Sequence, residues 1–282
     1  MDLGLRDATA VVVGGGRGMG LATAHCFAED GARVAVVGRN QASLDGAAAQ
    51  LRERGSPDAF GVVADTTDDA QVREAFSALS DHWGGQLNIL VNAVGPSVRG
   101  TFDELDDADW RQAVDEGAMG MVRCVRAALP LLRAADWARI VNFSAHSTQR
   151  QSEILPAYTA AKAMVTSVSK NLSLFLARDE ILVNVVSPGS IASEALVGWA
   201  NSVGVDGGDP YALMAAIDEH FGHPAHLPRA GLPTEIGPVV AVASPQVLAP
   251  IAAGEQVARR AAFERLTADA RSHDQLRQPR TL

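Results

Sequence analysis

The sequence predicts a doubly wound α/β fold, in which a parallel sheet lies between two layers of helices. Two observations predict it: short β-branched segments alternate with helix-length segments, and the first of these short segments ends at a cluster of glycines. The short segments are apolar on both faces, which is typical of strands that helices cover on both sides. Right-handed crossovers between such strands produce three layers, helix, sheet and helix.

Six segments have the length and composition of buried strands: residues 8–13, 33–37, 59–64, 89–91, 140–143 and 182–186. Residues 23–29 have helical composition, and residues 110–132 carry apolar side chains at helical spacing, which predicts a long core helix. Residues 195–232 are richer in Gly, Pro and His. We interpret this stretch as a lid that holds the substrate.

The composition excludes several classes of protein. The chain has 282 residues, of which 47% are hydrophobic and 20% charged, as expected for one globular domain. Its apolar runs are far shorter than the roughly 18 residues of a membrane span. The net charge of −9 argues against nucleic acid or an acidic membrane as a partner. Cys26 and Cys124 form no disulfide framework, and no basic and apolar leader opens the chain, so we expect a cytoplasmic protein.

A glycine-rich turn follows the first predicted strand and reads Gly14-Gly15-Gly16-Arg17-Gly18-Met19-Gly20. Glycines allow a close approach of the backbone to a pyrophosphate, and the following helix N-terminus supplies N–H groups for the anion. Five glycines in seven residues favour a dinucleotide site over a plain turn. We expect Gly14, Gly16, Arg17, Gly18, Met19 and Gly20 to bind the cofactor.

The end of the second predicted strand indicates which cofactor is used. An NAD site usually places an acidic residue there, on the ribose 2′-hydroxyl, but this chain has Gly38-Arg39. Arg39 could pair with a 2′-phosphate, and Arg17 could add a second cationic contact. We therefore predict NADP(H), with NAD(H) as the alternative. Arg39 could also be an ordinary surface residue, because the chain has 22 arginines and 2 lysines.

Tyr158 and Lys162 lie four residues apart and so share one face of a predicted helix. The chain contains only two tyrosines and two lysines, which makes a chance pairing improbable. A tyrosine titrates near pH 10, so it exchanges protons at neutral pH only where a nearby cation favours its anion. The pair predicts an acid/base centre, and a surface tyrosine and lysine are the alternative.

Glycines at 14, 18 and 20, followed by Tyr158 and Lys162, resemble the short-chain dehydrogenase/reductase family, near its oxoacyl-reductase branch. The resemblance covers roughly residues 5–240. It implies a Rossmann-like sheet and hydride transfer between a nicotinamide and a small ketone or secondary alcohol. Tyr158 would protonate the carbonyl oxygen, and Lys162 would hold the nicotinamide ribose and lower the tyrosine pKa. A homo-oligomer is also implied; if the family's closing strand is missing, we expect a dimer rather than the family's common tetramer.

The family resemblance assigns further cofactor contacts. Asp65 would hold the adenine ring, and Asn92 and Gly95 belong to an imperfect match to the family's Asn-Asn-Ala-Gly motif. The turn beside the nicotinamide and the carboxamide site would comprise Pro188, Gly189, Ile191 and Ser193.

The sequence departs from the family at three places. The family's catalytic serine, thirteen residues before the tyrosine, falls on Ala145; we assign the role to its neighbour Ser144, with Ser147 or no donor as alternatives. The family's helix asparagine falls on Gly117. The closing Val-Asp-Gly-Gly strand is absent, so we expect a family domain over residues 1–240, a missing or altered seventh strand, and an atypical, partly helical tail over residues 241–282.

The predicted lid contains three histidines close together in the sequence. His220, His223 and His226 look like metal ligands, but Gly222 and Pro224 interrupt the helix that would align them, so we expect a polar lid surface and no metal. The departures from the family also leave a second hypothesis, a dinucleotide-binding protein with little turnover that acts as a sensor or scaffold.

Overall fold

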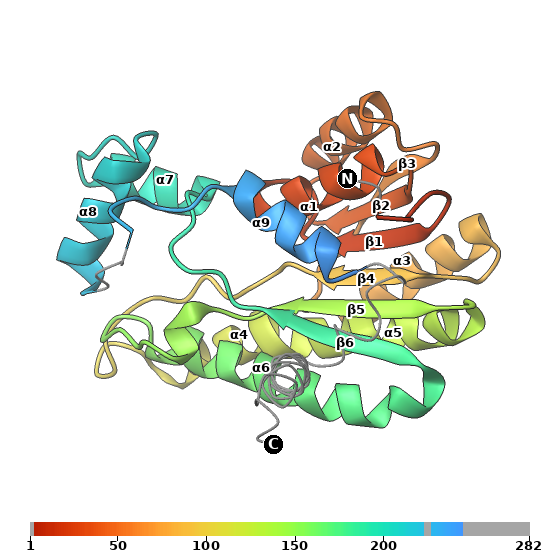
Figure 1. Ribbon diagram of the computed structural model, residues 1–282. Helices are drawn as coiled ribbons and strands as arrows, with labels where there is room; N and C mark the ends of the chain where they lie inside the picture. Colours follow the sequence, from red (N-terminus) through yellow and green to blue (C-terminus); the bar gives the residue numbers. More distant parts are fainter. Residues whose placement is uncertain (1–2, 223–226, 245–282) are drawn as a thin grey trace, which may run out of the picture.

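The computed structural model describes residues 3–222 and 227–244. Six strands of the described chain form one parallel sheet, in the order β3-β2-β1-β4-β5-β6 (Figure 1). Each predicted strand is present within two residues of its predicted ends, and the doubly wound class is confirmed. The strands are β1 (Thr9–Val13), β2 (Arg33–Gly38), β3 (Ala59–Val63), β4 (Ile89–Asn92), β5 (Ala138–Phe143) and β6 (Ile181–Val186).

The order of the strands determines where a ligand can bind. The chain runs from β1 outward to β2 and β3, then returns to place β4 on the other side of β1. Connections on the two sides of β1 therefore leave in opposite directions. In such a sheet, the crevice beyond the carboxyl ends of the two strands at the reversal, here β1 and β4, is the usual ligand site.

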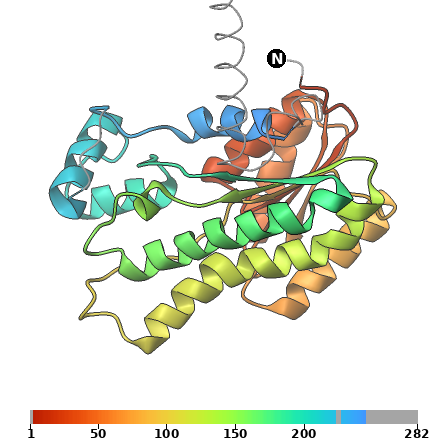
Figure 2. The same ribbon diagram turned by 60° about the horizontal axis from the view of Figure 1, so that its bottom comes forward.

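Helices cover both faces of the sheet (Figure 2). On one face, α1 (Gly18–Glu29), α2 (Gln41–Glu53) and α9 (Pro233–Val242) enclose an apolar cluster that includes Ala10 and Val12 of β1. On the other face, α3 (Asp69–Trp83), α5 (Gly120–Ala134) and α6 (Pro156–Phe175) enclose a second cluster that includes Val11 and Val13. Successive residues of β1 therefore point into different cores, which explains why this strand is apolar on both faces.

The predicted helix over residues 110–132 is longer and less regular than expected. It begins as α4 (Asp107–Val114), where Asp106 caps the helix and forms a reciprocal capping box with Asp109. A π-helical turn, Asp115–Met119, joins α4 to α5. The predicted start at residue 110 was therefore three residues too late. The first helix also begins earlier than predicted, at Gly18 rather than residue 23.

Two helices project from the sheet at one end of the molecule, α7 (Glu194–Ser202) and α8 (Pro210–Phe221) (Figure 1). They share a small apolar cluster that includes Leu213, Ile217 and Phe221. A bridge between Ile191 and Gly231 then returns the chain toward α9. Helix α9 packs so closely on α1 that a Cβ atom on Gly237 would lie 2.5 Å from the Ala22 carbonyl oxygen.

Strand β6 is an outer strand, and no seventh strand lies beside it among the described residues. The predicted tail beyond residue 244, and His223 and His226, lie outside the described residues. Within the described ranges, no helix is both long enough and apolar enough to cross a membrane.

Candidate active site

The glycine turn brings the start of α1 against the end of β1. Gly14 has a φ of +80°, a conformation that side chains disfavour. A Cβ atom on Gly20 would lie 2.2 Å from the Gly14 carbonyl oxygen, so only glycine fits there. None of the described side chains caps the first turn of α1, which starts after Arg17. Its N–H groups and the helix dipole therefore suit an anion such as a pyrophosphate.

A cleft of about 530 Å³ lies above this turn, over the ends of β1, β2, β3 and β4. Seven of its polar lining residues were not expected from the sequence: Asn40, Ser43, Thr66, Thr67, Ser97, Glu116 and Glu194. Asn40 caps α2 by accepting a hydrogen bond from the Ser43 N–H, a signal that the sequence carried. Ten predicted cofactor residues line the cleft: Gly14, Gly16, Arg17, Gly18, Met19, Gly20, Arg39, Asp65, Gly95 and Ser193.

The other predicted cofactor residues do not line this cleft; they are Asn92, Tyr158, Lys162, Pro188, Gly189 and Ile191. Asn92 is buried between strands, and its amide nitrogen donates to the Asn142 side-chain oxygen at 2.8 Å. Its own side-chain oxygen has no described hydrogen-bond partner. Asn92 therefore faces β5 rather than the cleft. Pro188 accepts a hydrogen bond from the His146 N–H at 2.9 Å.

Two charged groups lie at the cleft where the sequence predicted cationic contacts. Arg39 is exposed just after β2, and no carboxylate occupies that strand end. Arg17 forms an ion pair with Glu194, the first residue of α7, at 3.2 Å. Both side chains of this pair are largely exposed, so the pair contributes little to stability. Arg17 can therefore leave Glu194 and pair with another anion at a low cost in free energy. Asp65 accepts hydrogen bonds from the Thr67 N–H and hydroxyl.

Lys162 lies next to Gly95, behind the wall of the cleft. Its Nζ donates to the carbonyl oxygens of Phe143 at 2.8 Å and Val94 at 3.0 Å, at the ends of β5 and β4. A Cβ atom on Gly95 would lie 2.9 Å from this Nζ, so the ammonium lies directly behind a residue that lines the cleft. The side chain is only 3% exposed, and burial lowers the pKa of Lys162 to about 8.

Tyr158 precedes Lys162 by one helical turn on α6. Burial raises the pKa of Tyr158, and the positive charge of Arg99 partly offsets this rise. The family resemblance attributed such an effect to Lys162. Because Lys162 loses its proton near pH 8, below the raised pKa of Tyr158, it would be neutral before the phenol ionised. Arg99 lies in the loop after β4, and nothing in the sequence pattern pointed to it.

The two candidate serines have different surroundings. The Ser144 hydroxyl lies 2.7 Å from the Thr166 hydroxyl and donates to the Lys162 carbonyl oxygen at 3.0 Å. It therefore faces α6, and this geometry does not support its predicted contact with a substrate. Ser147, in the 3-10 turn His146–Thr148, is 7% exposed, and its hydroxyl has no described hydrogen-bond partner.

Gly117 lies in the π-helical turn, where the family has an asparagine. A Cβ atom there would come within 3.1 Å of the Pro96 ring and 3.2 Å of the Ala161 Cβ. A larger side chain would force these neighbours apart, so Gly117 permits the close packing of the π-helical turn on α6.

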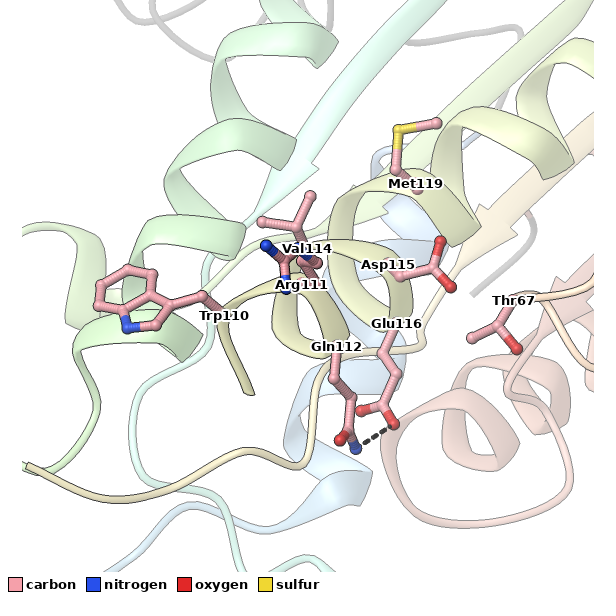
Figure 3. A pocket seen from close by; sticks show the side chains of 8 residues that line it. All are labelled: Thr67, Trp110, Arg111, Gln112, Val114, Asp115, Glu116 and Met119. Carbon is pink, nitrogen blue, oxygen red and sulfur yellow. Dashed lines mark hydrogen bonds between the residues drawn. The ribbon is translucent and has the colours of Figure 1, made fainter. Parts of the chain in front are cut away.

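A second hollow, of about 740 Å³, opens on the surface of α4 and the π-helical turn (Figure 3). Trp110 and Thr67 lie on opposite sides of the group of lining residues, and the Gln112 side chain donates to Glu116 at 2.8 Å. Thr67 and Glu116 line both this hollow and the cleft. Neither Tyr158 nor Lys162 lines it, so it is separate from the predicted acid/base centre.

No group of three or more metal-ligating side chains comes together within residues 3–222 and 227–244. The described histidine of the predicted lid, His220, lies 3.0 Å from the Ala216 carbonyl oxygen and packs its ring edge to face on Trp199.

A family model agrees with this combination of fold, glycine turn and tyrosine–lysine pair. The model of the short chain dehydrogenases matches residues 8–202, which is more than half of the chain. The chain belongs to the short-chain dehydrogenase/reductase family. It is an NAD(P)-dependent dehydrogenase/reductase that acts on small molecules.

Relatives of this short-chain dehydrogenase support the assignment. An uncharacterized oxidoreductase of Staphylococcus aureus (strain MW2) is 29% identical over 224 residues, which are 79% of this chain and 94% of the relative. The L-sorbose reductase of Gluconobacter frateurii, solved in complex with NADPH and L-sorbose, superimposes with a TM-score of 0.82 at 26% identity, over 90% of this chain and 96% of that one. A short-chain type dehydrogenase/reductase from Mycobacterium ulcerans, with a TM-score of 0.76 and 23% identity over 89% of this chain and 88% of that one, supports the fold.

Proposed function

We propose that this short-chain dehydrogenase/reductase transfers a hydride between NADP(H) and a ketone or secondary alcohol, with Tyr158 as the general acid/base. The position of Lys162 carries the proposal: its Nζ lies directly behind Gly95, which lines the cleft, and Tyr158 is one helical turn away. This position supports the interpretation that the tyrosine–lysine pair and the cleft belong to one site. When bound, the nicotinamide supplies the hydride in reduction and accepts it in oxidation.

Each part of the chain has a distinct task in this proposal. The glycine turn and the N-terminus of α1 bind the pyrophosphate. Lys162 is mostly protonated at pH 7, because its pKa is about 8, and its ammonium is held in place by two carbonyl oxygens. The raised pKa of Tyr158 keeps its phenol protonated at neutral pH. That form donates a proton to a carbonyl oxygen during reduction.

The preference for NADP(H) rests on the end of β2. Arg39 is exposed beside the cleft, and the strand end lacks the carboxylate that would repel a 2′-phosphate. The L-sorbose reductase of Gluconobacter frateurii, which this chain resembles, was solved with NADPH.

Three other expectations from the sequence remain predictions: the homo-oligomer, the cytoplasmic location and the lid function of α7 and α8.

Replacing Tyr158 by phenylalanine tests the proposal, because it removes the hydroxyl and keeps the ring. We expect Tyr158→Phe to lower turnover about 100-fold or more, since general acid/base catalysis contributes about 10²–10⁴-fold. NADPH oxidation is measured against a panel of ketones and oxoacyl thioesters, together with the NADPH dissociation constant. Unchanged NADPH binding would show that the site is intact. Tight NADPH binding without turnover that depends on Tyr158 would favour the sensor or scaffold hypothesis.

We further propose that Ser147, rather than Ser144, donates a hydrogen bond to the substrate oxygen. The support is that the Ser147 hydroxyl is buried and unpartnered, whereas the Ser144 hydroxyl is engaged with α6. We expect Ser147→Ala to lower kcat about 100-fold, the typical effect of losing one such donor. Ser144→Ala is the matched control and should mainly lower thermal stability, because it breaks the contacts to α6. A larger loss of kcat in Ser144→Ala than in Ser147→Ala would contradict this assignment.

A further inference from the structure

Arg99 lies where three segments of the chain meet. The residue after it, Gly100, donates its N–H to the Ile154 carbonyl oxygen at 3.0 Å, which joins the loop after β4 to the segment that precedes α6. The Arg99 guanidinium lies over the Phe221 ring, 5.9 Å from its centroid. Ser152 in turn donates to the Phe221 carbonyl oxygen at 2.9 Å. Figures 1 and 2 show α8 and the beginning of α6 at the same end of the molecule.

The charge of Arg99 is not neutralised by the protein around it. Among the described residues, none of the ion pairs includes Arg99, although nine other pairs form. Glu153, the acidic residue of the facing segment, is exposed and forms no described ion pair with Arg99. Arg99 is exposed, and its positive charge partly offsets the rise that burial causes in the pKa of Tyr158.

The contact with Phe221 gives this arginine a defined orientation. A guanidinium over an aromatic face is attracted by the ring and keeps its N–H groups free at its edge. Those N–H groups match the two oxygens of a carboxylate or the oxygens of a phosphate. The guanidinium thus offers its N–H groups to an anion on the side of α8.

We propose that Arg99 binds an anionic group of the substrate, so that the substrate is an oxo or hydroxy compound carrying a carboxylate or phosphate. The proposal rests on the proposed function of Tyr158. In reduction, the carbonyl carbon receives the hydride and the carbonyl oxygen receives the Tyr158 proton, giving the secondary alcohol. The anionic group stays unchanged and keeps its contact with Arg99.

The test compares substrates that differ only in charge. Oxo acids, their methyl esters and oxo phosphates of equal chain length are assayed for kcat/KM with the wild-type enzyme and with Arg99→Gln. We expect the wild-type enzyme to prefer the anion over the ester by about 10- to 100-fold, the value of a hydrogen bond to a charged group. In Arg99→Gln this ratio should fall toward one, mainly through KM. The oxo acid and oxo phosphate arms show which anion is preferred.

The ratio of kcat/KM for the anionic substrate to kcat/KM for its ester separates anion binding from other effects of Arg99. A change in the pKa of Tyr158 would alter turnover of both substrates and cancel in the ratio. Arg99→Lys, which keeps the charge, should retain part of the preference. Arg73→Gln, an exposed arginine on α3 that pairs with Asp69, is the control and should keep the full ratio.

Two outcomes would overturn the proposal: equal kcat/KM for anion and ester in the wild-type enzyme, or the same ratio in the wild type and Arg99→Gln. If neutral ketones are turned over with dependence on Tyr158 while the anion preference is absent, only the role of Arg99 fails. If no substrate shows turnover that depends on Tyr158, the proposed function itself fails.

Discussion

Burial of the Lys162 ammonium makes stability depend on pH. The pKa of Lys162 is about 8 in the folded chain and 10.5 in its ordinary state. Between these values the unfolded chain binds a proton at this position that the folded chain has lost, so the free energy of unfolding rises with pH. Below pH 8 both states are protonated and the penalty is constant. Relative to Lys162→Met, the wild type should therefore gain about 3 kcal/mol between pH 7 and pH 10.5.

Urea unfolding of both proteins at a series of pH values measures this gain. In Lys162→Met the two carbonyl oxygens that Lys162 contacts lose a hydrogen-bond donor at every pH. This loss changes the free energy of unfolding by a constant amount and does not alter how the difference between the two proteins varies with pH. Lys170→Met, which replaces the chain's other lysine on the same helix, is the control. An equal pH dependence for both substitutions would contradict the assignment to Lys162.

Helical spacing explains which candidate site residues the sequence could indicate. Tyr158 and Lys162 were found because residues four apart share a helix face regardless of the rest of the fold. The sequence could not indicate the position of Arg99, which depends on how the loop after β4 faces α8. It could not indicate the orientation of Ser144 either, which depends on how the end of β5 faces α6. Asn92 illustrates the same limit: the motif placed it at the cofactor, whereas its amide pairs with Asn142.

The contact between α1 and α9 depends on the absence of a side chain at Gly237. A Cβ atom there would lie 2.5 Å from the Ala22 carbonyl oxygen and 3.1 Å from the Cys26 sulfur, so the helices would have to separate. Overpacking of this kind costs about 1–3 kcal/mol, more than the roughly 0.5–1 kcal/mol that alanine gains over glycine in a helix. We expect Gly237→Ala to lower the free energy of unfolding by about 1–2 kcal/mol.

Gly46 provides a matched control on α2. It is exposed within the helix, and a Cβ atom there would meet nothing within 4 Å. Gly46→Ala should therefore stabilise the protein by about 0.5–1 kcal/mol through helix propensity alone. Chemical denaturation of both variants gives the comparison, and a stabilised Gly237→Ala would show that α9 does not pack as closely on α1 as described.

The central strands β1, β4 and β5 were predictable because they are buried on both faces, so that burial itself appears in the sequence as an apolar run. The outer strand β3 is partly exposed but is apolar as well. The helix between β4 and β5 was harder to predict from the sequence. Its start depends on the capping box of Asp106 and Asp109, and its middle contains a π-helical turn around Gly117. A π-helical turn changes the hydrogen-bond register without changing the apolar pattern, and the sequence pattern therefore indicated one regular helix.

Cofactor binding should stabilise the whole molecule, because the cleft is built from segments that fold together: the ends of four strands, the start of α1 and the start of α7. A ligand at 100 times its dissociation constant adds about 2.7 kcal/mol. For a domain of this size, each kcal/mol raises Tm by about 2–4 °C, so NADPH should raise Tm by about 5–10 °C. At equal concentration NADH should raise Tm less, since it lacks the 2′-phosphate that we assign to Arg39.

The same thermal measurement tests Arg39 directly. In Arg39→Asp, a carboxylate at the end of β2 would repel the 2′-phosphate and could accept hydrogen bonds from the ribose hydroxyls of NADH. We expect the larger rise in Tm to pass from NADPH to NADH. Arg52→Asp makes the same change of charge on the last turn of α2, outside the cleft, and should leave NADPH the better stabiliser. If Arg39→Asp behaves as Arg52→Asp does, the 2′-phosphate binds elsewhere, and the nearby Arg17, which Glu194 releases at low cost, becomes the residue to replace.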